Sequence, residues 1–311
     1  MSLKIAVLLP CRNEEKTIRA VVEDFRRVLP EARVCVFDNC STDRTREEAL
    51  AAGAEIYFEP HIGKGAVVRS MFREVDADVY LMADGDGTYP ADRARELIQP
   101  VLEGRVDMVV GTRLQQHAAG SFPRMHQFGN HLVRDILNIL FRANLVDVLS
   151  GYRCFSKRFV KTMPVLSKGF EIETEMTLYA LDQGFLIQEI EIPYGERPEG
   201  STSKLNTVRD GFRVLKTLLW VFKDYRPLLF FGGLGLFSIL SGLGFGSFVL
   251  HEFTTTGRMT HPSTALLSAA LGTIGFLLIT TGLILDTVNR RSRELHLLLV
   301  DHVIRFPHRK H

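Results

Sequence analysis

The stretch VYLMADGDGTYP, residues 79–90, decides how this chain folds. Its first six residues are mostly apolar and predict a buried strand that ends at Asp84. A second carboxylate, Asp86, follows two positions later. Gly85 and Gly87 allow the backbone to turn at this point instead of continuing as a strand. The stretch therefore predicts a strand end at which two carboxylates converge on one point.

Strand-like runs and helical periods alternate on both sides of this stretch. Strands are expected at residues 4–10, 33–38, 54–59, 79–84 and 107–113. Helices are expected between them, two of them at residues 64–74 and 91–102. This alternation predicts an α/β fold with a mostly parallel central sheet and helices on both faces. Ligands of such sheets bind at the carboxyl ends of the strands, so residues at those ends are candidate site residues.

Polar residues follow the other strands at the same edge. They are Arg12 and Glu14 after the first strand, Asp38 at the end of the second, and Lys64 at the start of the third helix. The paired carboxylates suit Mg²⁺ or Mn²⁺ bridging to a diphosphate. Asp38 can hydrogen-bond a base or a ribose, and Lys64 with the helix N–H groups can face a phosphate. Each of these features alone is common in turns and helix caps. Their expected position together at the carboxyl edge of one sheet is what indicates a binding site.

The distribution of charge separates a water-soluble part from a membrane part. Residues 227–285 contain only two charged side chains, Glu252 and Arg258. Within them, residues 227–250 and 262–285 carry no charge, and each is long enough to cross about 30 Å of hydrocarbon. We therefore expect a two-helix transmembrane hairpin, the alternative being a buried helical hairpin of a soluble protein. Basic residues lie just before the first span and just after the second: Lys223, Arg226, Arg290, Arg291 and Arg293.

Four segments follow from these patterns. They are a cytoplasmic domain at residues 1–204, a juxtamembrane helix at 205–226, the hairpin at 227–285 and a basic cytoplasmic tail at 286–311. The apolar positions of 205–222 keep helical spacing with basic residues between them, which suits the headgroup layer or a helix packed on the domain. The positive-inside rule predicts that both termini are cytoplasmic, in a multi-pass protein of the cell (inner) membrane.

Composition excludes several classes of protein. The net charge is only +2, from 38 basic and 36 acidic residues, so nothing favours a nucleic acid partner. The 4 cysteines include no C-x-x-C pair, which is typical of reduced thiols in a cytosolic domain. The first strand is followed by Pro10-Cys11-Arg12-Asn13 rather than a G-x-G-x-x-G loop, and Gly63-Lys64 is followed by Gly65 rather than Ser or Thr. Dinucleotide oxidoreductases and P-loop NTPases are therefore excluded.

The motifs taken together resemble the family 2 glycosyltransferases with a GT-A fold. Those that carry this resemblance are LLPCRNEEKTI, VFDNCSTDRT, GKGAVVRSMF and ADGDGTYP. Later blocks resemble the polyprenyl-phosphate branch, which includes dolichol-phosphate mannose synthase and bacterial undecaprenyl-phosphate glycosyltransferases. These blocks are GTR at 111–113, SGYRCFSK at 150–157, GFEIETEM at 169–176 and RPEGSTSKL at 197–205. The resemblance covers about residues 3–225.

The resemblance implies a role for each matching residue. The nucleotide would be bound by Pro10, Arg12, Glu14, Asp38, Lys64 and Asp84. Asp84 would also face the metal, Asp86 would be its direct ligand, and Mg²⁺ or Mn²⁺ would be the cofactor. Asp86, Arg113 and Glu175 would be catalytic, although Glu173 matches the same acidic position as Glu175. The acceptor phosphate would be bound by Arg124, Arg153, Arg197, Ser203 and Lys204.

The implied function is transfer of a sugar from a UDP- or GDP-linked donor to undecaprenyl or dolichyl phosphate, with inversion at the sugar. Two positions depart from the family pattern. Asn39 and Cys40 stand where the family usually has an acid and a glycine, and Thr88 stands where some mannose synthases have a Gln ligand. An identical metal shell is therefore not expected.

Two other functions remain open at this point. A transferase acting on a growing polysaccharide or glycolipid would share the N-terminal motifs, but the single tryptophan, Trp220, lies in no Q-x-x-R-W motif. A non-catalytic scaffold that binds sugar nucleotides would tolerate loss of the acidic residues, and these are intact. The partners expected are the donor, the lipid acceptor and the membrane. Small residues in the first span, such as Gly242 and Gly246, would also permit close helix packing, either within the hairpin or between the subunits of a homo-oligomer.

Overall fold

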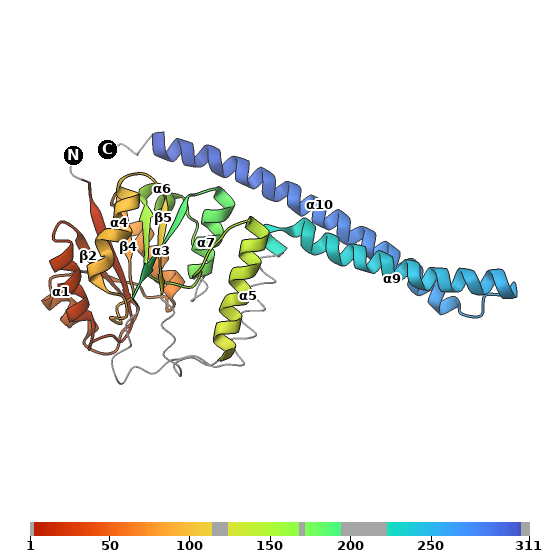
Figure 1. The fold of residues 1–311 in the computed structure, drawn as a ribbon, viewed down its shortest axis with the longest axis horizontal. Coiled ribbons are helices and arrows are strands. Elements are labelled where there is room, and N and C mark those ends of the chain that lie inside the picture. The colour runs from red at the N-terminus through yellow and green to blue at the C-terminus, as the bar shows by residue number, and fades with distance from the viewer. Residues whose placement is uncertain (1–2, 114–123, 168–171, 194–222, 306–311) are drawn as a thin grey trace. The chain divides into compact units, whose positions relative to one another are not determined.

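A computed structural model of the chain describes residues 3–113, 124–167, 172–193 and 223–305. The chain divides into two compact units, Met1–Gly211 and Phe212–His311, called here the sheet unit and the hairpin unit (Figure 1). The expected helix at residues 205–222 lies outside the described residues.

The sheet unit is built on one seven-stranded sheet in the order β3-β2-β1-β4-β6-β5-β7. Its strands are β1 (Ile5–Cys11), β2 (Arg33–Asp38), β3 (Glu55–Phe58), β4 (Val79–Met82), β5 (Met108–Arg113), β6 (Arg153–Ser156) and β7 (Ile187–Ile192). All neighbours pair in parallel except β6, which runs antiparallel to both β4 and β5. The predicted α/β fold with a mostly parallel sheet is confirmed, and β6 is an antiparallel strand that the sequence did not predict.

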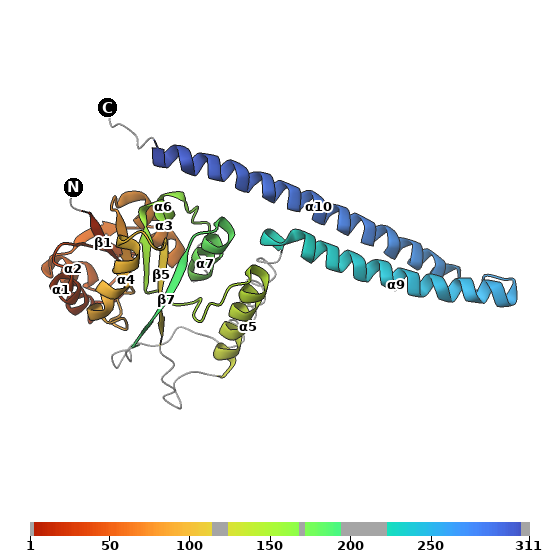
Figure 2. The same ribbon diagram turned by 45° about the horizontal axis from the view of Figure 1, so that its top comes forward.

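Helices cover both faces of this sheet (Figure 2). They are α1 (Ile18–Val28), α2 (Thr45–Ala51), α3 (Lys64–Glu74), α4 (Ala94–Leu102), preceded by the 3₁₀ turn η1 (Ala91–Arg93), α5 (Arg124–Phe141), α6 (Lys157–Thr162) and α7 (Ile172–Gln183). Side chains alternate across β1: Val7 and Leu9 pack in the cluster with α1, α2 and α4, and Ala6 and Leu8 in the cluster with α3, α6 and α7. The sheet is thus buried on both sides, as its continuous apolar strands require.

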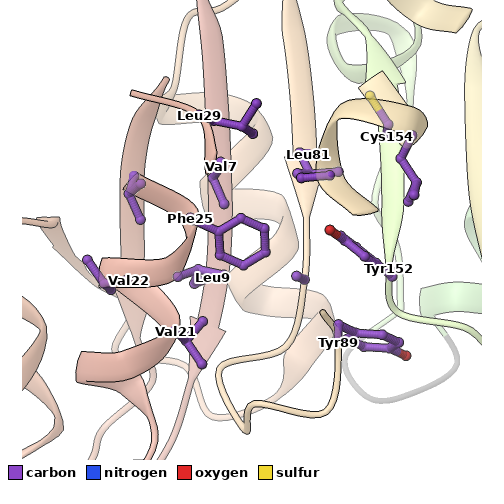
Figure 3. Packing of buried hydrophobic residues seen from close by; sticks show 14 of the residues in the cluster. Val7, Leu9, Val21, Val22, Phe25, Leu29, Leu81, Tyr89, Tyr152 and Cys154 are labelled. Atoms are coloured by element: carbon purple, nitrogen blue, oxygen red, sulfur yellow. The ribbon is translucent and has the colours of Figure 1, made fainter. Parts of the chain in front are cut away.

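Aromatic packing ties the start of β6 to the turn after β4. Phe25 of α1 points toward the sheet beside Val7 and Leu9 (Figure 3), and its ring centroid lies 6.4 Å from that of Tyr152. Tyr152 in turn lies 5.2 Å from Tyr89, ring centroid to ring centroid. A buried aromatic side chain contributes about 1.5–3 kcal/mol to folding. The contact between Tyr152 and Tyr89 therefore holds the start of β6 against the turn that contains Asp84 and Asp86, called here the acidic turn.

The hairpin unit contains two long helices, α9 (Pro227–Thr256) and α10 (Pro262–Arg305), that pack along each other. Gly257 ends α9 with a left-handed φ of 67°, and Pro262 begins α10. The segments Pro227–Thr256 and Pro262–Ser292 are each long and apolar enough to cross a membrane, with a mean hydropathy of 1.9 over their apolar stretch. They contain the predicted spans and extend past them, because helical hydrogen bonding continues into the polar residues that follow.

Small residues form the contact between these two helices. A Cβ added to Gly235 would lie 2.6 Å from the carbonyl oxygen of Gly275. The Ser238 hydroxyl donates to the Leu271 carbonyl at 2.8 Å, and a matching bond of 2.7 Å runs from Ser268 to the Gly242 carbonyl. Close backbone approach with serine hydrogen bonds is typical of helix pairs packed in an apolar solvent.

Candidate active site

The sheet places the predicted polar residues at one edge. Strands β1, β2, β4 and β5 point the same way, so their carboxyl ends meet there, and the antiparallel β6 begins there. Cys11 lies opposite Asp38 and Met82 lies opposite Arg153 in the strand registers. Asp38, Asp84, Arg113 and the segment before β6 therefore lie along one line across the sheet edge, as the sequence predicted for Asp38 and Asp84.

A buried ammonium group joins two carboxylates at the centre of this edge. Lys64 is the first residue of α3, and its side chain is only 10% exposed. Its Nζ lies 2.6 Å from Asp84 Oδ1 and 2.6 Å from Glu173 Oε1. Burial alone would lower the pKa of Lys64, but the two carboxylates outweigh it and raise that pKa above its ordinary value. Lys64 therefore stays protonated, and it joins the end of β4 to helix α7.

The backbone before β6 packs directly against this cluster. A Cβ added to Gly151 would lie 2.8 Å from Asp84 Oδ2 and 3.1 Å from Lys64 Nζ, so a side chain at this position would displace them. The Gly151 N–H donates to the Tyr89 hydroxyl at 2.8 Å, and burial raises the pKa of Tyr89. Only glycine allows the chain to pass this close to the two charges.

The second carboxylate of the acidic turn is held by its own neighbours. Asp86 is 8% exposed, and its Oδ1 accepts hydrogen bonds from the N–H and the hydroxyl of Thr88, at 3.1 Å and 2.6 Å. The Thr17 hydroxyl donates to the Gly85 carbonyl at 2.8 Å, which ties α1 to the same turn. Thr88, the departure from the family pattern, thus orients Asp86.

The acidic turn provides the hard oxygen ligands that a divalent cation needs. Among the residues that the structure describes, no group of three or more His, Cys, Asp or Glu side chains is arranged to hold a metal ion. Mg²⁺ is commonly held by one or two carboxylates, with the remaining ligands supplied by substrate phosphates and water. Asp84 and Asp86 fit that arrangement, in which the cation binds together with a diphosphate.

Asp38 presents a buried carboxylate oxygen at the end of β2. The side chain is fully buried, and its Oδ1 accepts the Ser41 N–H at 3.2 Å. Its Oδ2 has no hydrogen-bond partner within the described ranges, and Arg46 Nε lies 3.6 Å away. A buried acceptor without a donor is costly, so this oxygen is suited to a donor group of a ligand.

The loops after β1 and β2 are joined by hydrogen bonds. Asn13 and Ser41 are joined at 2.9 Å, Thr42 and Asn13 at 2.8 Å, and Glu14 and Thr45 at 2.8 Å. These bonds fix the segment that contains the predicted nucleotide residues. Pro10 and Glu14 are half-buried in it, and Arg12 is exposed.

Arg113 is held by a carboxylate that sequence reasoning missed. Its Nε and Nη2 donate to the two oxygens of Asp147, at 2.8 Å and 3.0 Å. Burial raises the pKa of Asp147, but the hydrogen bonds and charge of Arg113 together with the Leu149 N–H outweigh it, so the net pKa is below its ordinary value. Glu189 of β7 accepts the N–H groups of Val146 and Asp147, which fixes the loop that presents Asp147.

Two predicted site residues have structural partners instead. Arg153, predicted to bind the acceptor phosphate, is fully buried and donates to the carbonyls of Ser150 and Val148 and to the Thr177 hydroxyl. It has no surface for a lipid phosphate, so we leave it out of the proposed site. Glu175, predicted to be catalytic, accepts the N–H groups of Leu166 and Ser167, at 2.8 Å and 2.9 Å.

Glu173, rather than Glu175, contacts the charged cluster. Residues two apart on a helix point in different directions, so only one of the pair can face the sheet edge. The signal that selects Glu173 is the phase of α7, which the sequence did not define. Arg124 is the first residue of α5, and Arg197, Ser203 and Lys204 lie outside the described residues.

Comparison with known proteins gives consistent results. The family described as Glycosyl transferase family 2 matches residues 6–163. The glycosyltransferase AglJ of Haloferax volcanii is 34% identical over 291 residues, which are 93% of this chain and 95% of that protein. The dolichyl-phosphate hexose transferase of the same organism is 26% identical over 222 residues, 71% of this chain and 95% of that protein.

Solved structures show the same fold. Glucosyl-3-phosphoglycerate synthase of Mycobacterium tuberculosis, in complex with Mn²⁺, UDP and phosphoglyceric acid, gives a TM-score of 0.58 at 21% identity, covering 70% of this chain and 78% of that chain. The same enzyme with Mg²⁺ and UDP gives 0.55 at 20% identity, covering 70% and 79%. The predicted GT-A fold is confirmed.

Proposed function

Because the chain belongs to glycosyl transferase family 2 and is a glycosyltransferase, we propose that it moves a sugar from a nucleoside-diphosphate sugar to a polyprenyl phosphate. The donor is UDP- or GDP-linked, and the acceptor is undecaprenyl or dolichyl phosphate. The observation that carries the proposal is the cluster of Lys64 with Asp84 and Glu173 beside the carboxylate of Asp86. It provides a cation and paired carboxylates at the sheet edge where the donor diphosphate has to lie.

The donor is bound along the ends of β1, β2 and β4. Asp38 Oδ2, which pairs with Arg46 but accepts no hydrogen bond from the described part of the chain, accepts one from the base. We assign Pro10, Arg12 and Glu14 to the same nucleotide site. Lys64 pairs with Asp84 at the end of β4, which is separated from β2 by β1 in the sheet, and we assign it to the phosphates. This order along the edge matches the order of groups in a nucleoside-diphosphate sugar.

A divalent cation, Mg²⁺ or Mn²⁺, would be held by Asp86 and Asp84. When bound, it neutralises negative charge on the departing diphosphate. Support comes from the carboxylate pair itself and from the Mn²⁺ and Mg²⁺ in complexes of the mycobacterial synthase. Thr88 keeps the carboxylate of Asp86 in a single orientation.

The acceptor is activated by its own charge. The second pKa of a phosphate monoester is about 6, so a polyprenyl phosphate is largely dianionic at neutral pH and needs no general base. One of its oxygens forms a bond to the anomeric carbon while the bond from that carbon to the diphosphate oxygen breaks, which inverts the sugar and releases a nucleoside diphosphate. Arg113, oriented by Asp147, binds this phosphate and reduces the repulsion between the two anions.

Arg124, Arg197, Ser203 and Lys204 complete the proposed acceptor site. The relative named dolichyl-phosphate hexose transferase supports a lipid phosphate as acceptor. The two apolar helices support membrane association. We propose that residues 1–204 and the tail at 286–311 are cytoplasmic, that 205–226 lies on the inner leaflet, and that 227–285 is the anchor in the cell membrane.

The test is a transfer assay on the purified full chain. The protein is incubated with UDP- and GDP-sugars, Mg²⁺ or Mn²⁺, and either undecaprenyl phosphate, the corresponding alcohol or a glycan oligomer. The proposal predicts a glycolipid with the lipid phosphate only. Transfer to the glycan in place of the lipid phosphate, or no transfer to any acceptor, would contradict it.

A further inference from the structure

Asn39, directly after Asp38, makes three hydrogen bonds to the loop between β3 and α3. Its side chain is nearly buried, at 4% exposed. The amide nitrogen donates to the carbonyls of Glu59 and His61, at 3.0 Å and 2.9 Å, and the amide oxygen accepts the Gly63 N–H at 2.8 Å. Only a side-chain amide can donate two hydrogen bonds and accept one in this way.

This loop leads into Lys64. Gly63 has a φ of 138° and a ψ of 139°, a conformation that side chains with a Cβ rarely adopt, and it precedes the first residue of α3. The loop is also held at its start by the carboxylate of Glu59. This carboxylate accepts a hydrogen bond from the His61 N–H at 2.8 Å and another from the Ser70 hydroxyl of α3. The direction in which α3 begins therefore depends on bonds that Asn39 makes.

Asn39 is itself fixed to the sheet. Its backbone N–H donates to the Cys11 carbonyl at 2.9 Å, which anchors it to the end of β1. The next residue, Cys40, has a left-handed φ of 58° and directs its thiol to the carbonyls of Glu59 and Pro60. Asn39 thus connects the ends of β1 and β2 to the loop between β3 and α3, and this connection fixes the position of Lys64 at the end of that loop.

We propose that Asn39 is a positioning residue that places the Lys64 ammonium for the diphosphate of the donor. The inference rests on the proposed function, in which Asp38 binds the base and Lys64 faces the phosphates. The two neighbouring residues then divide donor recognition between them. Asp38 acts on the nucleoside directly, and Asn39 acts on the diphosphate through Gly63 and Lys64.

The substitution Asn39→Asp tests this division. It keeps the shape of the side chain but replaces two N–H donors with an oxygen that faces the carbonyls of Glu59 and His61. Binding of UDP, UMP, GDP and GMP to the full-length protein is measured by titration calorimetry with Mg²⁺ present. We expect the diphosphate of the preferred base to bind at least about tenfold more weakly, a change of about 1.4 kcal/mol, and the monophosphate to bind as in wild type.

Asn138→Asp is the matched control. Asn138 of α5 also holds a loop with its amide, donating to the Leu145 carbonyl at 3.0 Å and accepting the Leu145 N–H at 2.9 Å. This variant loses an amide donor and gains a charge in the same way, but its two bonds hold Leu145, and neither of them reaches residues 59–64, which lead into α3. Diphosphate binding is expected to be unchanged in this variant.

Hydrogen exchange and a second variant separate positioning from loss of folding. Asn39→Asp should lose amide protection in residues 59–66 while the peptides of β1 and β4 keep theirs. Gly63→Ala, which strains the same loop from its other end, should give the same loss of diphosphate binding. In a Lys64→Met background, Asn39→Asp should have no further effect, because both changes act on one group.

The outcomes distinguish this inference from the proposed function. If wild type binds neither diphosphate, the proposed function is wrong. If wild type binds a diphosphate and Asn39→Asp binds it equally well, or weakens the monophosphate to the same extent, the positioning role is wrong. A full tenfold loss that persists in the Lys64→Met background would also contradict it.

Discussion

The sheet unit and the hairpin unit place their polar and apolar groups in opposite ways. In the sheet unit, apolar side chains fill both faces of the sheet, and buried charged groups such as Asp38 and Arg153 gather at its carboxyl edge. In the hairpin unit, large apolar side chains face outward, Phe237 with 71% of its surface exposed, and glycines and serines form the inner contact. The difference supports the proposed membrane association of the hairpin unit, in which lipid would surround the outward-facing apolar side chains.

The comparison also predicts what a substitution does in each unit. At the sheet edge, charged groups are held in place by hydrogen bonds and ion pairs. Replacing one of these partners should change activity more than it changes the stability of the fold. In the hairpin, the described contacts between the helices are close packing and serine hydrogen bonds, so substitutions there should change stability and leave the chemistry unaffected. The variants below test that separation in order of decreasing effect.

Asp86→Asn should have the largest effect. It removes a carboxylate from the proposed metal site but keeps an oxygen for the bonds from Thr88, so the turn should persist. Turnover should fall by at least about 100-fold, the scale of a lost charge-stabilising group, with an unchanged unfolding temperature. Asp92→Asn, an exposed residue of η1, is the control and should keep full activity. Full activity of Asp86→Asn, or of wild type in EDTA, would refute the metal assignment.

Asp147→Asn should have an intermediate effect on one substrate only. Arg113 would lose its paired acceptor and its fixed orientation. The KM for the polyprenyl phosphate should rise about tenfold, with the KM for the sugar nucleotide unchanged, as steady-state kinetics in detergent would measure. An equal rise in both KM values would show that Asp147 supports the fold rather than the acceptor site.

Gly151→Ala should have a smaller effect on the site. The added Cβ would lie 2.8 Å from Asp84 Oδ2. The other oxygen of that carboxylate, Oδ1, is paired with Lys64, so the carboxylate cannot move away freely. The carboxylate has to rotate, so we expect a loss in kcat of roughly three- to tenfold, the range of about 0.6–1.4 kcal/mol. The unfolding temperature should change little. Wild-type kinetics in this variant would show that the contact with Asp84 is not part of the catalytic arrangement.

Gly235→Ala should change stability alone. Its Cβ would meet the Gly275 carbonyl at 2.6 Å and push α9 and α10 apart, at a cost of about 1–3 kcal/mol. Gly244→Ala, where no atom lies within 4 Å of the added Cβ, is the matched control and should behave as wild type. Thermal unfolding in detergent measures both, and kcat on a short soluble acceptor should be unchanged. A lower kcat for Gly235→Ala would contradict the separation of the two units.

The elements predicted well from the sequence are parallel strands and a helix whose local apolar pattern agrees with their burial in the fold. The expected bounds of β2 and α3 match the structure, β1 is shifted by one residue at both ends, and β5 begins one residue later than expected. Parallel strands buried on both faces give apolar runs that periodicity recognises. The placement of Asp38, Lys64 and Asp84 at one edge followed from this alternation.

The rest depended on contacts that no local pattern contains. Helix α7 is buried from Ile172 to Ala180 on every side, so it lacks the one-sided apolar period that marks a surface helix. Strand β6 is short and begins with Arg153, a residue type that is usually exposed. Its burial depends on acceptors at Val148, Ser150 and Thr177, which only the folded chain brings together.

The identity of the nucleotide released during transfer tests the central claim most directly. The purified chain is mixed with its sugar nucleotide, Mg²⁺ and polyprenyl phosphate, and the nucleotide and the lipid product are quantified together by chromatography and mass spectrometry. The account predicts one nucleoside diphosphate released per lipid that gains a sugar, with neither product formed when the lipid phosphate is omitted. Release of a nucleoside monophosphate with a lipid diphosphate sugar, or release of nucleotide without any glycolipid, would contradict it.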